Sequence, residues 1–200
     1  MGPFRLRAPL LLASGSPRRR ELLESAGLRP LVRAVDVDET PLAGEAPGAY
    51  LERIVTAKLQ AALGLPEAAA PAVVLVADTT VVLDERVLGK PASDDEALEM
   101  VRAIAGRRHE VRTRFALARV GEPSHARTVV TEVEVRALEP RAIAAYVATG
   151  EGRDKAGSYA IQGQFGASVT RIDGSYTNVV GLPLAEVVEL LERLGLAEPA

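Results

Sequence analysis

The run AVVLVADTTVVL, residues 72–83, is the most apolar extended stretch of the chain, and it decides the fold. Strands buried on both faces show such near-continuous apolar runs, because helices cover both sides of their sheet. We therefore expect a central strand here. The Asp84-Glu85 pair that follows predicts a turn. This turn would make a hairpin that ends at VLGKP, residues 87–91.

Extended and helical patterns alternate on both sides of this strand. Helical periodicity and end signals predict helices over 17–26, 44–65, 93–106, 139–150 and 181–196. Further extended segments are expected over 10–13, 28–39, 109–120 and 126–138, the last two as a hairpin. Ser93 and Glu96 have the spacing of a capping box. The alternation predicts an α/β fold with a mixed sheet.

Composition narrows the class of protein. A chain of 200 residues suits one globular domain, and 48% hydrophobic with 26% charged residues excludes a disordered or fibrous chain. The net charge of −3 gives no reason to expect nucleic acid, and the apolar runs are too short to span a membrane. The absence of cysteine excludes thiolate metal sites and fits a cytoplasmic protein. His109 and His125 are expected to be structural.

The stretch LLLASGSPRRRELL, residues 10–23, places three arginines at the start of a predicted helix. A Ser-Pro pair has the preferences of an N-cap and a first helical residue, so Arg18, Arg19 and Arg20 fall in the first turn. The N-terminal end of a helix dipole is positive and favours anions. Three cations there are unfavourable unless an anion completes the arrangement.

Residues three or four apart share a helix face, which turns Arg18 and Arg19 toward the body of the protein with the leucines of the next turn. Arg20 instead lies over Glu24 and is expected to be its solvated partner.

With Ser14 and Ser16, the arginines Arg18 and Arg19 and the free N–H groups of the helix start predict a phosphate cradle. The alternative is a basic helix end that forms ion pairs with the acidic segment at 36–39.

Asp78 closes the apolar part of the central strand, where an unpaired charge would be costly. Because the carboxyl ends of strands face the ligand crevice in open α/β sheets, we predict that Asp78 binds a metal or acts as a general base for water. The alternative is a structural aspartate that caps a following turn through Thr79 or Thr80.

The segment VDVDE, residues 35–39, gathers three carboxylates. Alternation along an extended chain puts Asp36 and Asp38 on one side and Glu39 away from both. A Mg²⁺ ion prefers one or two carboxylates together with substrate phosphates. These residues alone leave open whether the segment binds a metal or is a solvated acidic loop.

Three further polar residues are candidates for ligand contacts. Lys58 and Lys90 stand in otherwise apolar sequence, where each can reach phosphates or extend to solvent. The glycine-rich loop at 150–166 carries Gln162, whose amide offers one acceptor and two donors for the Watson–Crick edge of a base. A loop glutamine without a role is the alternative.

Seven segments, in order and spacing, resemble the Maf-like nucleotide pyrophosphatase family over essentially the whole chain. They are LLLASGSPRRRELL, VDVDET, VTAKLQA, VLVADTTVVLDERVLGKP, GRRHEVRT, DKAGSYAIQG and IDGSYTNVVGLPL. The form AIQG at 160–163 resembles the dTTP/UTP pyrophosphatase branch, and the branch that acts on 7-methyl-GTP has a different pattern there.

The resemblance implies one domain over residues 1–200 with a fold like that of inosine triphosphate pyrophosphatases. That fold is α/β, a mixed twisted sheet with flanking helices and two lobes around a central cleft. It also implies a cytoplasmic enzyme that uses a divalent metal cation, Mg or Mn, to hydrolyse dTTP and UTP to the monophosphate and pyrophosphate. A homodimer is an expectation of the family, whereas nucleic acid and membrane partners are not expected.

Carried over by motif position, the family's proton acceptor falls on Asp78 and its specificity residues on Arg18, Thr79 and Gln162. The remaining polar motif positions fall on Ser14, Arg19, Glu39, Lys58 and Lys90. Glu39 and Asp78 are the expected metal ligands. Phosphate binding is expected of Ser14, Arg18, Arg19, Lys58 and Lys90.

Two other functions stay in view. The same chemistry could act on another nucleotide such as 7-methyl-GTP, against which Gln162 argues. Alternatively, the protein could be a nucleotide-binding regulator of cell division, against which the complete set of Asp78 and its basic residues argues.

Overall fold

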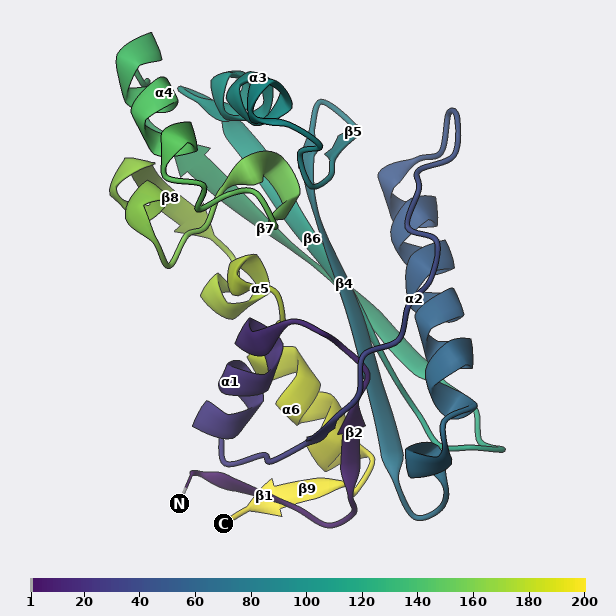
Figure 1. The fold of residues 1–200 in the computed structure, drawn as a ribbon. Coiled ribbons are helices and arrows are strands. Elements are labelled where there is room, and N and C mark those ends of the chain that lie inside the picture. Colours follow the sequence, from purple (N-terminus) through teal and green to yellow (C-terminus); the bar gives the residue numbers. More distant parts are fainter. Residues whose placement is uncertain (1) are drawn as a thin grey trace. The chain divides into compact units, whose positions relative to one another are not determined.

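The computed structural model describes residues 2–200, which divide into two compact units (Figure 1). Unit 1 consists of the chain up to Asp78, Thr113–Val129 and Gly181–Ala200, and unit 2 of Thr79–Arg112 and Val130–Val180. Three long strands contribute residues to both units: β4 (Val73–Leu83), β6 (Arg108–Ala118) and β7 (His125–Val135).

Seven strands form one sheet in the order β3-β2-β4-β6-β7-β8, with β5 paired to β4. The shorter strands are β2 (Leu10–Leu12), β3 (Leu31–Val32), β5 (Arg86–Leu88) and β8 (Val169–Asp173). Strand β2 is parallel to both β3 and β4, whereas β4–β5 and β7–β8 are antiparallel pairs. The predicted mixed sheet and the central position of the most apolar strand are therefore confirmed.

The helices match the predicted segments within a few residues at each end. They are α1 (Pro17–Ser25), α2 (Pro47–Leu63), α3 (Asp94–Ile104), α4 (Pro140–Ala148) and α6 (Leu184–Arg193). Short 3₁₀ turns occupy Pro66–Ala68, Ala156–Ser158 and Gln164–Ser168. Within residues 2–200, no helix is both long enough and apolar enough to cross a bilayer.

In unit 1, α2 lies on one side of β4, and α1 and α6 lie on the other (Figure 1). The side chains of β4 alternate between these two helical layers. Val73 and Leu75 belong to the core formed with α1 and α6, whereas Val74 and Val76 belong to the core formed with α2. Because side chains alternate with a period of two, Asp78 falls on the α2 side. Burial on both faces explains why this strand is a continuous apolar run.

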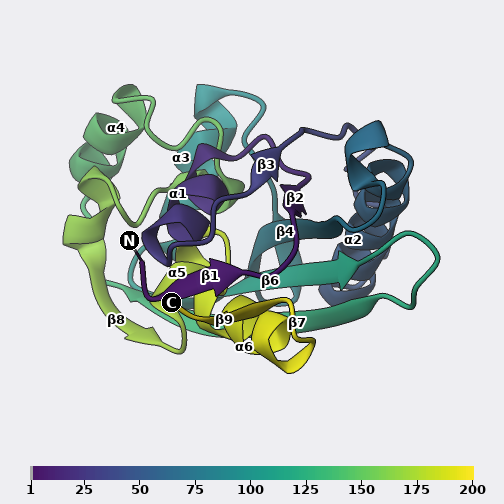
Figure 2. The ribbon, with the colours of Figure 1, turned by 90° about the horizontal axis from the view of Figure 1, so that it is seen from below.

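Four short elements were not expected from the sequence. They are β1 (Phe4–Leu6), β8, α5 (Tyr176–Val180) and β9 (Ala197–Pro199). Strands β1 and β9 lie side by side as a separate antiparallel pair (Figure 2). Three-residue strands carry too little periodicity to be recognised, and their partners lie almost the whole chain away.

The sequence signals for the ends of helices and strands were right in some places and wrong in others. Half of the predicted capping box of α3 is present: the Glu96 N–H donates to Ser93 Oγ at 3.2 Å, but the Glu96 carboxylate accepts from the N–H of Ala92 at 2.6 Å in place of that of Ser93. Of the extended segment predicted at 28–39, only β3 is a strand. Asp78 lies in the middle of β4 and not at its end, because β-branched residues continue the strand and pair with β5. The alternative of a turn-capping aspartate is therefore wrong, as is the argument from the strand end.

The core of unit 2 packs the far ends of the long strands against α3 and α4. His109 Nε2 lies 2.8 Å from the hydroxyl oxygen of Tyr159, whose ring packs on Phe165. His109 is 3% exposed, and burial lowers the pKa of its imidazole to about 4. The expectation that His109 is structural agrees with this packing.

The buried imidazole predicts a pH dependence of stability. Between a folded pKa of about 4 and an ordinary pKa near 6.5, the unfolded state binds more protons, so stability falls as the pH falls. Burial of His109 should remove about 2 kcal/mol from the free energy of unfolding between pH 7 and pH 4.5. Urea unfolding at both pH values should show this loss reduced in His109→Gln. The exposed His125→Gln serves as the control, and equal losses in all three proteins would contradict the assignment.

Candidate functional site

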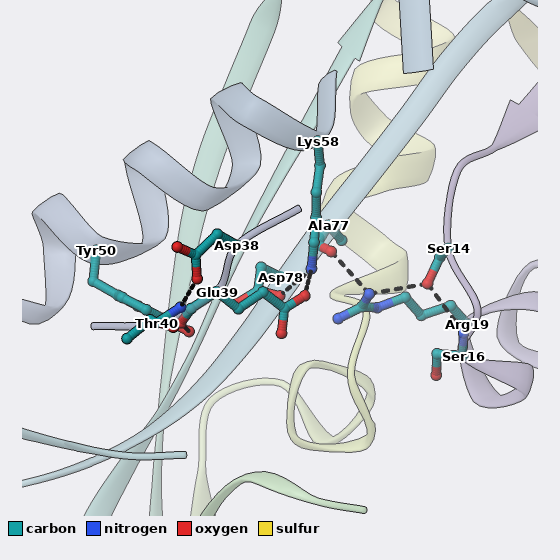
Figure 3. A network of polar contacts seen from close by, with 10 residues as sticks. All are labelled: Ser14, Ser16, Arg19, Asp38, Glu39, Thr40, Tyr50, Lys58, Ala77 and Asp78. Carbon is teal, nitrogen blue, oxygen red and sulfur yellow. Dashed lines mark hydrogen bonds and ion pairs between the residues drawn. The ribbon is translucent and has the colours of Figure 1, made fainter. Parts of the chain in front are cut away.

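A buried lysine on α2 bonds to two carboxylates in unit 1 (Figure 3). Lys58 Nζ lies 2.6 Å from Asp78 Oδ1 and 2.6 Å from Glu39 Oε1. Lys58 and Asp78 are 8% and 7% exposed, whereas the Glu39 side chain is 40% exposed. The lysine therefore does not extend to solvent. It compensates the charge of a carboxylate that the central strand buries.

Two periodicities bring this pair together. The alternation of β4 turns Asp78 to the α2 layer. On α2, Tyr50, Ile54 and Lys58 recur every four residues and share one buried ridge of the helix. Each periodicity is visible in the sequence, but which helix covers which face of the strand is decided by the tertiary structure.

Tyr50 belongs to this site and was missed by the sequence analysis. Its hydroxyl donates to the backbone oxygen of Glu39 at 3.2 Å. Burial, with the negative charges of Asp78 and Glu39, raises the pKa of Tyr50 to about 12, so it stays a neutral donor. The four-residue spacing to Lys58 through Ile54 was the signal that could have found it.

Arg19 joins three segments of unit 1. Its Nη1 donates to Ser14 Oγ at 3.0 Å and to the Ala77 carbonyl at 2.8 Å, while Nε donates to the Gly181 carbonyl at 2.8 Å. The side chain thus turns toward the body of the protein, as predicted from the helix face. It fixes the start of α1 against β4 directly beside Asp78 (Figure 3).

The charge of Arg19 is balanced by the carboxylates of the site. Burial lowers the pKa of the Arg19 guanidinium, and nearby Arg18 adds to this effect. The charges of Asp78 and Glu39 act in the opposite direction. Because an arginine remains protonated in proteins, the start of α1 keeps its positive charge beside the two carboxylates.

The helix start itself differs from the predicted cap. Ser16 is the N-cap residue and Pro17 the first helical residue, but the Ser16 hydroxyl caps no N–H group. Instead, the buried Ser14 hydroxyl accepts the N–H of Ser16 at 3.2 Å. The predicted contact of Arg20 with Glu24 is confirmed as an exposed ion pair at 3.8 Å.

The acidic segment contributes one carboxylate to the site. Glu39 bonds to Lys58, while Asp36 and Asp38 are exposed. Asp38 accepts the N–H of Thr40 at 2.9 Å, and hydrogen bonding to Thr40 lowers the pKa of the Asp38 carboxyl. This separation of Glu39 from Asp36 and Asp38 agrees with the predicted alternation.

The other predicted site residues belong to unit 2. Thr79 follows Asp78 directly on β4 and is half-buried. Lys90 is exposed just after β5, and Gln162 is exposed in the glycine-rich loop. The Gln162 side chain makes no hydrogen bond within residues 2–200, so its amide is available to a ligand.

The donor set of unit 1 fits a hard divalent cation that also binds a substrate phosphate. Asp78 and Glu39 supply carboxylate oxygens close to one another through their shared lysine. Asp78 Oδ2 has no hydrogen-bond partner within residues 2–200. No three of the histidine, aspartate and glutamate residues in this range gather as a full metal site, so substrate oxygens would have to complete the coordination.

Arginine, lysine and carboxylate groups gathered at a helix start suit an enzyme that acts on phosphate compounds. The family model of Maf-like proteins matches residues 9–194, and the chain belongs to this family.

Curated relatives cover nearly all of the chain. The dTTP/UTP pyrophosphatase of Nitrosomonas europaea is 47% identical over 198 residues, which cover 94% of this chain and 95% of the relative. That of Myxococcus xanthus is 48% identical over 190 residues, 95% of this chain and 94% of the relative. Among solved structures, a HAM1 protein from Coxiella burnetii is similar at 17% identity with a TM-score of 0.49, covering 93% of this chain and 99% of that one.

Removing the lysine should destabilise the protein. Lys58→Met leaves Asp78 as an uncompensated buried charge and should lower the free energy of unfolding by about 3 kcal/mol at pH 7. Adding Asp78→Asn should recover most of this loss, because a neutral amide no longer needs the cation. Urea unfolding measures both effects. Arg20→Met, which removes an exposed pair, is the matched control and should change stability by less than about 0.5 kcal/mol.

A Lys58→Met protein as stable as the Arg20→Met control would contradict the compensating role of the lysine.

Proposed function

We propose that this protein hydrolyses dTTP and UTP to the nucleoside monophosphate and pyrophosphate. The observation that carries the proposal is the buried Asp78–Lys58–Glu39 arrangement beside the arginine-bearing start of α1. It occurs in a chain of the Maf-like family that is 46–48% identical to five relatives named dTTP/UTP pyrophosphatases, over more than nine-tenths of its length.

In the proposed reaction, a water molecule attacks the α-phosphorus of the nucleotide. The new bond joins the water oxygen to the α-phosphorus, and the bond from the α-phosphorus to the bridging oxygen breaks with release of pyrophosphate. Asp78 accepts the proton of the water. Lys58 holds Oδ1 of this carboxylate, which leaves Oδ2 as the proton acceptor.

The cationic residues stabilise the charge that develops on the departing pyrophosphate. We assign phosphate contacts to the Ser14 hydroxyl, Arg18, Lys58 and Lys90. Arg19 adds its positive charge to the same phosphate site. Its hydrogen bonds to the carbonyls of Ala77 and Gly181 hold the start of α1 in place.

A divalent metal cation, Mg or Mn, completes the proposal. Glu39 and Asp78 would hold it together with phosphate oxygens of the substrate. Bound there, it would supply Lewis-acid polarisation of the phosphate.

The base is recognised in this proposal by Gln162. Its amide donates to O4 and accepts from N3–H of uracil or thymine. Cytosine presents the donor and acceptor in reverse, so it would leave both groups mispaired. Thr79 and Arg18 are the other proposed specificity residues. A cytoplasmic location and a homodimer remain predictions.

Pyrophosphate release from nucleotides tests the proposed reaction. With Mg²⁺ or Mn²⁺, the protein should release pyrophosphate from dTTP and UTP, and a chelator should stop the reaction until the metal is restored. Asp78→Asn should lower kcat by about 10²- to 10⁴-fold, because the proton acceptor is lost. Pyrophosphate release across dTTP, UTP, CTP, dCTP, GTP and 7-methyl-GTP measures both.

If the protein preferred 7-methyl-GTP, the proposed reaction would stand but the proposed recognition of uracil and thymine would be refuted. No turnover of any nucleotide would refute the enzyme itself and favour a nucleotide-binding regulator of cell division.

Substitution of Gln162 tests the proposed recognition of the base. Gln162→Ala should lower kcat/KM for UTP and dTTP by about 10- to 100-fold, because the amide that pairs with the base is lost, and should leave other nucleotides nearly unchanged. Gln164→Ala is the matched control, since its side chain is exposed two residues along the same loop. Equal losses on every nucleotide would argue against base recognition by Gln162.

A further inference from the structure

The carboxylate of Glu151 lies inside the loop that carries Gln162. The backbone N–H of Gln164 donates to Glu151 Oε2 at 2.8 Å, and the N–H of Phe165 donates to Oε1 at 3.3 Å. Both carboxylate oxygens therefore accept from the backbone that directly follows Gln162. Hydrogen bonds to an ionised acceptor are stronger than those between neutral groups.

The loop passes so close to this carboxylate that a side chain at position 163 would displace it. A Cβ atom on Gly163 would lie 2.3 Å from Glu151 Oε2 and 2.4 Å from Oε1. The φ of Gly163 is −101°, which any residue can adopt. The glycine next to Gln162 is thus needed for the approach of Glu151 and not for an unusual backbone conformation.

Glu151 is itself held in place from two sides. Its N–H donates to Thr149 Oγ1 at 3.2 Å, and its carbonyl accepts from Lys155 Nζ at 2.9 Å. Within residues 2–200, the carboxylate oxygens of Glu151 form no ion pair with arginine or lysine, so no cationic side chain competes with the loop for them.

The other side of Gln162 is fixed by a tyrosine. The N–H of Ala160 donates to the hydroxyl oxygen of Tyr146 at 3.3 Å. The ring of Tyr146 packs on Phe165, with ring centroids 4.9 Å apart. Burial raises the pKa of Tyr146, so its hydroxyl stays neutral. Gln162 is consequently an exposed residue on a loop anchored before and after it.

We infer that Glu151 is a positioning residue for base recognition: it holds residues 160–165 so that the Gln162 amide is oriented before the nucleotide binds. The inference rests on the proposed function, because it assigns to Gln162 the base contact proposed above. A loop ordered in advance loses less conformational entropy on binding. Since this contact forms with substrate and transition state alike, its loss raises KM more than it lowers kcat.

The experiment compares Glu151→Ala and Glu151→Gln with wild type and with Glu134→Gln. Glu134 is the matched control, because its carboxylate pairs with Arg108 at the surface of the same unit and contacts no loop N–H. Gly163→Ala is a second variant that keeps Glu151 and pushes its carboxylate out of the loop.

Amide hydrogen exchange in the unliganded protein measures how firmly Glu151 holds the loop, and it requires no assay of activity. In Glu151→Ala, the amides of Gln164 and Phe165 should exchange at least about tenfold faster, whereas those of Val133 and Val135 in the core of unit 2 should not change. Glu151→Gln, which keeps one acceptor oxygen, should lie between Glu151→Ala and wild type. Exchange unchanged at Gln164 and Phe165 would overturn the anchoring role.

Steady-state kinetics measure how the loss of Glu151 affects recognition of the base. Glu151→Ala and Gly163→Ala should raise KM for UTP about tenfold, leave kcat within about threefold, and reduce the preference for UTP over CTP. If wild type prefers UTP and both variants keep that preference, positioning by Glu151 is refuted while the proposed function stands. If wild type hydrolyses neither UTP nor dTTP, the proposed function fails and the base-reading role with it, whatever the exchange rates are.

Discussion

The ion pair between Lys58 and Asp78 is the interaction on which the rest of the candidate site depends. A central strand covered on both faces buries a carboxylate, and burying a charge is costly unless a partner of opposite charge is buried with it. Lys58 supplies that charge at 2.6 Å, and its second contact draws Glu39 to the same place. Two carboxylates around one ammonium group are of little use for stability alone, since an apolar pair would pack as well. The arrangement suits the chemistry that we propose for the site.

The position of Asp78 beside Lys58 depends on the alternation of side chains along β4. Val73, Leu75 and Ala77 pack in the core with α1 and α6, whereas Val74 and Val76 pack in the core with α2. A slip of one residue in the register would exchange the two faces and place Asp78 away from Lys58. Parallel pairing of β4 with β2 fixes that register and brings the start of α1 to the same region, where Arg19 bonds to the carbonyl of Ala77.

Two glycines in the glycine-rich loop of unit 2 are needed for different physical reasons. Gly163 leaves room for a carboxylate, whereas Gly157 adopts a φ of +67° and would clash with Val81 if it carried a Cβ. One glycine is thus required by a neighbouring side chain and the other by conformation and packing together. Both glycines lie in the loop that carries the exposed Gln162, the residue for which we propose recognition of the base.

The sequence by itself determined the elements whose signals are local. The apolar run of β4, the helix start at Pro17, the N-cap at Ser93 and the contact of Arg20 with Glu24 follow from periodicity and capping. The motif segments likewise pointed to the Maf-like family, which the family model supports. Only the tertiary structure decided that Lys58 meets Asp78, that Tyr50 bonds to Glu39, that β1 pairs with β9, and that Glu151 lies within the Gln162 loop. These contacts join residues whose separation in sequence carries no periodic signal, because they depend on which surfaces the chain buries against each other.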